Sequence, residues 1–89
     1  MFRVEWLQSA LDELAAIWTA AASGQRQAIT QASHAIDQRL AEDAANEGES
    51  RPGGRRITFV PPLAVRYRIE PESQTVTVLH VRAFQRRRP

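Results

Sequence analysis

Hydrophobic and polar positions divide the chain into a helical first half and a stranded second half. Apolar residues recur every three or four positions over about residues 10–22 and again over about 25–42, which predicts two amphipathic helices. Only a short Ser-Gly link joins them, so we expect the helices to lie antiparallel as a hairpin. Residues 2–6 alternate between apolar and polar side chains, which predicts a short strand before the first helix.

The period changes to two in the second half of the chain. Residues 46–54 hold three glycines, a proline and no aliphatic side chain, so we interpret them as a linker. After this linker, Ile57 and Phe59 alternate with polar residues until Pro61-Pro62 ends the run, which predicts a strand.

Two further strands follow the proline pair. Over residues 63–70, Leu63, Val65, Tyr67 and Ile69 alternate with Ala64 and three charged residues. Residues 75–83 are apolar at most positions, which is typical of a strand that is buried on both faces.

The predicted element order is β-α-α-β-β-β within a single α+β domain over residues 1–89. Neither helix can leave its apolar stripe in water, so we expect the helical hairpin to pack on one face of a small antiparallel sheet. Residues 85–89 are expected to fray.

Charge separates the two halves of the chain as clearly as periodicity does. All 12 basic residues are arginines; residues 1–50 hold three of them against eight acids, and residues 51–89 hold nine against two acids. Such asymmetry points to a polyanion or an acidic partner for the second half. The alternative is that a preference for arginine reflects genome base composition and that the clustering is accidental.

Composition excludes several classes of protein. Without cysteine the chain forms no disulfide and no Cys-ligated metal site, and the spacing of its His, Asp and Glu residues indicates no metal site of another kind. No glycine-rich phosphate loop is present, and we expect no cofactor. The longest apolar run, 14–18, is too short to span a membrane, and acidic residues occupy the place of a signal-peptide core. A cytoplasmic domain is the expectation.

Arginines on the strand at 63–70 are the first candidates for chemistry. If its apolar residues face the helices, Arg66 and Arg68 point to the other face of the sheet, and Arg56 joins them if the strand register places it nearby. Guanidinium groups bind phosphate bidentately, so this face is a candidate RNA or phosphate surface. The alternative is that these charges serve solubility and discourage edge-to-edge aggregation.

His34 and His80 are the only imidazoles. We interpret His34, in the middle of the second helix, as a partly exposed packing residue. His80, on the last strand, is either a general acid or base or a buried, hydrogen-bonded side chain.

Taken together, the pattern resembles the RelE/ParE superfamily of toxins from bacterial type II toxin–antitoxin, or plasmid stabilisation, systems. The resemblance covers nearly the whole chain. It rests on the segments Phe2-Arg3-Val4-Glu5-Trp6, Ala10-Leu11-Asp12-Glu13-Leu14, Arg51-Pro52-Gly53-Gly54-Arg55-Arg56, Val65-Arg66-Tyr67-Arg68-Ile69-Glu70 and Val76-Thr77-Val78-Leu79-His80-Val81.

The resemblance implies one of two activities. RelE-like members cut mRNA on the ribosome, and ParE-like members poison DNA gyrase without an enzymatic step. For cleavage, the resemblance implies that Arg56 and Arg86 stabilise charge at the phosphate, with His80 as a candidate for the acid–base role. Two features depart from the cleaving members: Ala64 stands where they carry an arginine, and residues 85–89 hold no tyrosine.

The resemblance also implies an acidic antitoxin as partner in a hetero-oligomer. Arg55, Arg66, Arg68 and Arg82 are then the candidates for binding RNA or the antitoxin. We therefore expect the toxin of such a pair, acting by ribosome-dependent mRNA cleavage. The alternatives are a gyrase inhibitor and a degenerate, non-toxic binding domain.

Overall fold

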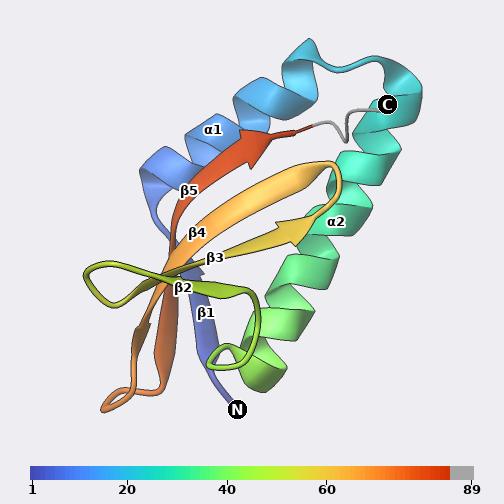
Figure 1. The fold of residues 1–89 in the computed structure, drawn as a ribbon. Coiled ribbons are helices and arrows are strands. Elements are labelled where there is room, and N and C mark those ends of the chain that lie inside the picture. The colour runs from blue at the N-terminus through green and yellow to red at the C-terminus, as the bar shows by residue number, and fades with distance from the viewer. Residues whose placement is uncertain (85–89) are drawn as a thin grey trace, which may run out of the picture.

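Five strands form one sheet, and two helices cover one of its faces (Figure 1). The computed structural model describes residues 1–84. The elements in chain order are β1 (Arg3–Trp6), α1 (Gln8–Ala20), α2 (Ser23–Asp43), β2 (Glu49–Arg51), β3 (Arg55–Val60), β4 (Leu63–Glu70) and β5 (Thr75–Ala83). The predicted α+β class and the helical hairpin on one face of the sheet are confirmed.

The order of strands across the sheet is β1-β5-β4-β3-β2. The observed sheet differs from the predicted sheet in two ways. β1 pairs with β5 in parallel, so the sheet is mixed rather than wholly antiparallel. β2 lies within the segment that was expected to be a linker and pairs with β3. Three exposed polar residues make up β2, so its sequence lacks the alternation of apolar side chains from which a strand is predicted.

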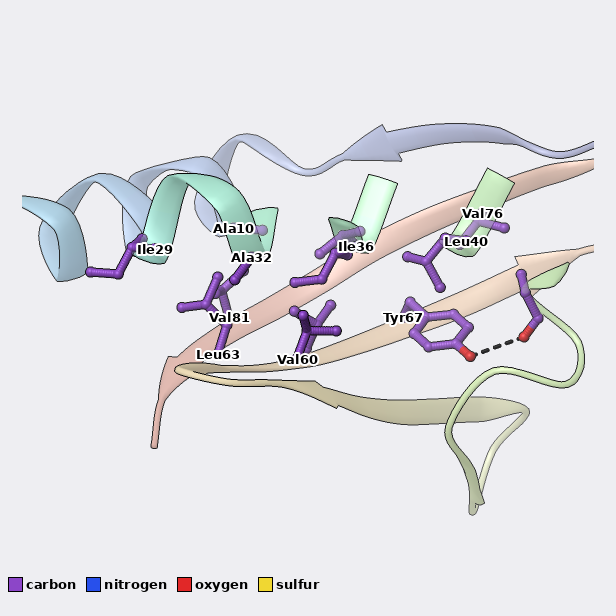
Figure 2. Close-up of a cluster of buried hydrophobic side chains, with 13 residues drawn as sticks. Ala10, Ile29, Ala32, Ile36, Leu40, Val60, Leu63, Tyr67, Val76 and Val81 are labelled. Atoms are coloured by element: carbon purple, nitrogen blue, oxygen red, sulfur yellow. Dashed lines mark hydrogen bonds between the residues drawn. The ribbon is translucent and has the colours of Figure 1, made fainter. Parts of the chain in front are cut away.

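The hydrophobic core lies between the helices and the central strands (Figure 2). α2 contributes one stripe at helical spacing, from Ile29 through Ala32 and Ile36 to Leu40, all buried. β4 contributes Leu63, Val65 and Tyr67, which are fully buried. Burial of each large aliphatic side chain contributes about 1.5–3 kcal/mol, so this layer holds the helices on the sheet.

A bulge in β5 decides which way its last residues point. The register passes from Arg66 opposite His80 to Tyr67 opposite Val78, so Leu79 has no partner on β4. Val78 lies in the core before the bulge and Val81 lies in the core after it. His80 is consequently exposed on the face that the helices leave uncovered.

No helix in the described part of the chain is long and apolar enough to cross a membrane.

Candidate functional site

Arginines from four strands lie on the face of the sheet opposite the helices, which we call the open face. Residues directly opposite each other in paired strands share a face, so the register fixes the arrangement. Three rows cross the sheet, with one residue from each strand that they reach: Arg51, Arg55, Arg68, Thr77 and Glu5; Glu49, Ile57, Arg66 and His80; Phe59, Ala64 and Arg82.

Two of these arginines are paired with acids on the same strand. A guanidinium nitrogen of Arg68 lies 3.3 Å from a carboxylate oxygen of Glu70. Arg51 and Glu49 are paired in the same way at 3.5 Å. Arg55 and Arg66 form no ion pair within residues 1–84. Because all four groups in the two pairs are well exposed to water, the pairs contribute little to stability and open easily.

The second and third rows surround a hollow of about 340 Å³, lined by Ile57, Ala64, Arg66, His80 and Arg82. Two guanidinium groups and the exposed imidazole therefore lie around one space. The interpretation of His80 as a buried side chain is wrong, because the bulge in β5 turns it outward.

Glu13 on α1 reaches over to this part of β5. One of its carboxylate oxygens accepts the backbone N–H of Val81 at 3.0 Å. The other accepts a hydrogen bond from the Arg82 guanidinium and lies 3.6 Å from Nδ1 of His80. The hydrogen bond from Arg82 lowers the pKa of Glu13; partial burial opposes it, and the Val81 N–H adds to the lowering.

A lowered pKa makes the stability of the fold depend on pH. Ionised Glu13 stabilises the folded chain above its ordinary pKa, near 4.5, and this contribution is lost as the pH falls through the lower, folded-state pKa. We expect the free energy of unfolding to decrease as the pH falls from near the ordinary pKa of 4.5 through the lower, folded-state pKa, and to decrease less in Glu13→Gln. Urea denaturation across this range measures both slopes, and parallel slopes would contradict the assignment.

Arg56 does not join the open face. It pairs with Tyr67 across β3 and β4, so it lies on the side of the helices. Its guanidinium donates to the backbone carbonyls of Glu47 and Gly48, both at 3.1 Å. These bonds close the loop between α2 and β2, so the guanidinium of Arg56 stabilises the backbone of this loop.

Tyr67 closes the same loop from beneath. Its hydroxyl donates to the carbonyl of Ala44 at 2.9 Å (Figure 2). It also contacts the carbonyl of Glu47. Burial raises the pKa of Tyr67, so the hydroxyl keeps its proton and remains a donor. The Thr58 hydroxyl completes the closure by donating to the Glu47 carboxylate at 2.7 Å.

The structure thus brings most of the sequence-derived candidates together. Arg55, Arg66, Arg68, Arg82 and His80 lie on the open face. Arg56 lies on the other side, because Thr58 and Val60 rather than Ile57 and Phe59 face the helices. Arg86 lies outside the described residues.

Glu13 was missed by reasoning from the sequence. The available signal was its position three residues after Ala10 and next to Leu14, two apolar residues of the predicted helix, because this spacing places Glu13 beside the apolar stripe.

A second hollow is apolar. It has a volume of about 670 Å³ and lies between the ends of the helical hairpin and the sheet, lined by Ala16, Ile17, Ala20, Ala21, Gln25, Ala28, Ile29, Pro61, Pro62, Ala83 and Phe84. A lining of this kind suits hydrophobic side chains of a protein partner.

One protein-family model matches residues 4–87 of the chain, and its description is the ParE toxin of the type II toxin–antitoxin system parDE. A search of curated proteins finds no match.

Solved structures share the fold at low sequence identity. A chain of the chromosomal ParDE toxin–antitoxin system from P. aeruginosa superposes with a TM-score of 0.75 at 17% identity, covering 96% of this chain and 98% of that one. The toxin–antitoxin complex RelBE2 from Mycobacterium tuberculosis gives 0.68 at 19% identity, covering 92% and 96%. The isolated E. coli RelE toxin gives 0.65 at 17% identity, covering 98% and 88%.

Proposed function

Because the chain belongs to the ParE toxin family of type II toxin–antitoxin systems, we propose that it arrests growth by binding DNA gyrase, without a catalytic step of its own. This target is the one that the resemblance to ParE-like toxins implies. Cleavage of mRNA on the ribosome is the second candidate.

The proposal rests on how the candidate catalytic groups within residues 1–84 are engaged. Arg82 and His80 both face the carboxylate of Glu13, and Arg56 is bound to backbone carbonyls. Efficient catalysis needs groups preorganised toward the reacting phosphate, so groups directed at the protein's own acceptors are poorly disposed for it. Ala64, in the row of Arg82, adds no charge.

The apolar hollow supports a protein target. Its walls are almost entirely aliphatic or aromatic, and Phe84 also packs edge-to-face on the exposed ring of Phe59. Apolar surface that remains accessible to water is typical of protein–protein contacts. A phosphodiester chain gains little from such a surface.

One observation favours the second candidate. The 340 Å³ hollow gathers Arg66, Arg82 and an exposed imidazole around one space. A nuclease in the RelE manner would use His80 there for proton transfer, and its loss would then cost about 100-fold or more in rate.

We further propose an acidic antitoxin as the partner of the chain in a hetero-oligomer. The open face carries arginines from β2, β3, β4 and β5, and its exposed ion pairs open at little cost. Complementary charge on a partner would increase both the association rate and the specificity.

The gyrase and ribosome proposals are separated by His80→Ala, with His34→Ala as the matched control because His34 is an exposed imidazole on α2. Each variant is expressed in a bacterial host, with and without the open reading frame next to the gene for this chain, which is where the proposed antitoxin would be encoded. We expect all three proteins to arrest growth, to be rescued by the neighbour and to leave plasmid DNA relaxed.

Primer extension on cellular mRNA is expected to show no codon-phased cuts. Loss of toxicity in His80→Ala alone, together with such cuts in the unmodified chain, would establish the nuclease instead.

A further inference from the structure

The carboxylate of Glu13 occupies a site made by two hydrogen-bond donors and a nearby imidazole of β5. Val81 supplies a backbone N–H to one oxygen, and Arg82 supplies a guanidinium to the other. The His80 imidazole lies 3.6 Å from that second oxygen. The carboxylate is thus bound at both oxygens by groups that belong to a different element of the fold.

The site exists because β1 is short. β1 ends at Trp6, opposite Val78, so within residues 1–84 no strand continues along this side of β5 where Val81 follows. The N–H of Val81 is left without a strand partner, and the carboxylate takes the place of the missing carbonyl. The bulge at Leu79 turns His80 and Arg82 to the same region.

We propose that this is a carboxylate-binding site that Glu13 fills in the free protein, and that an acidic segment of a partner protein displaces Glu13 from it. We infer a carboxylate as the ligand because the site already holds the carboxylate of Glu13, and each of its two oxygens accepts a hydrogen bond from a different residue. Arg66, which forms no ion pair within residues 1–84, lines the adjoining hollow and offers a contact for a second carboxylate.

The exchange requires little rearrangement of the fold. The side chain of Glu13 keeps 27% of its surface exposed and that of Arg82 keeps 65%, so water and a ligand both reach the pair. An incoming carboxylate would restore each hydrogen bond that Glu13 gives up. Because Glu13 is tethered to α1, its effective concentration is high, and only a segment with several carboxylates competes well. The inference does not depend on which target the toxin attacks.

Binding of a hexaglutamate peptide tests the proposal on the full chain at low salt. Glu13→Gln empties the site of its charge, and we expect about tenfold tighter binding, the equivalent of one charge-assisted hydrogen bond. Glu70→Gln is the matched control, because it makes the same charge change and releases Arg68 on the same face without freeing a backbone N–H. It is expected to change the affinity less than about twofold, and Arg82→Ala added to Glu13→Gln should abolish the gain.

The unmodified chain gives a second readout that does not depend on any variant folding. Hexaglutamate should shift the amide resonance of Val81 more than that of Thr77, which lies in the part of β5 that pairs with β1. An unmoved Val81 resonance at saturating peptide would overturn the proposal, as would equal gains in Glu13→Gln and Glu70→Gln. Preference of Glu13→Gln for hexathymidylate over hexaglutamate would also overturn it, by identifying a phosphodiester site.

Discussion

Gly48→Ala is expected to destabilise the fold by about 2–5 kcal/mol. Gly48 has a φ of +70°, a conformation that costs a residue with a side chain about 1–2 kcal/mol. A Cβ there would also lie 2.1 Å from the carbonyl oxygen of Ile57, so the loop or β3 must move. Overpacking of this kind adds about 1–3 kcal/mol.

Gly53→Ala is the matched control for this substitution. Gly53 has a φ of +80°, but a Cβ at this position meets no atom of the described part of the chain within 4 Å. The control therefore bears only the conformational cost, about 1–2 kcal/mol. Urea denaturation of both variants measures the difference. Equal losses in the two variants would show that the close approach of Gly48 to β3 is not a feature of the folded protein.

Arg56→Ala is expected to cost about 2–3 kcal/mol of stability, because two charge-assisted hydrogen bonds to backbone carbonyls are lost. The carbonyls of Glu47 and Gly48 would need water in place of the guanidinium. Toxicity of this variant should fall only in proportion to the fraction of folded protein.

Arg55→Ala is the control that distinguishes the loss of the hydrogen bonds of Arg56 from the loss of one positive charge. Arg55 lies next to Arg56 on β3 but is exposed and forms no ion pair within residues 1–84. Its loss should change stability by less than about 0.5 kcal/mol. If Arg56→Ala kept full stability and lost toxicity, Arg56 would be a functional residue rather than a closure of the loop.

Periodicity predicted most of the elements because the core uses it directly. The strands β4 and β5 match their predicted ranges, since Leu63 to Tyr67 alternate into the core and the first five residues of β5 are all buried. The helices were placed within about two residues of their observed ends. The alternation of apolar and polar residues within a strand does not indicate the direction of its neighbour, so it could not predict that β1 pairs with β5 in parallel.

The candidate site was predicted in part, and the misses have physical causes. Arg66 and Arg68 lie on the open face because their neighbours on β4 fill the core. Arg56 was misplaced because the polar pair Arg56 and Thr58 faces inward to satisfy the loop after α2, which reverses the apolar alternation of β3. Glu13 was missed because its partners are 68 and 69 positions away in the sequence.

The most direct test of the proposed function is ATP-dependent supercoiling of relaxed plasmid by purified gyrase in the presence of the purified chain. We predict that supercoiling decreases with increasing amounts of the unmodified protein and decreases equally with His80→Ala. Undiminished supercoiling at saturating excess, together with cutting of ribosome-bound mRNA by the same preparation, would contradict the account.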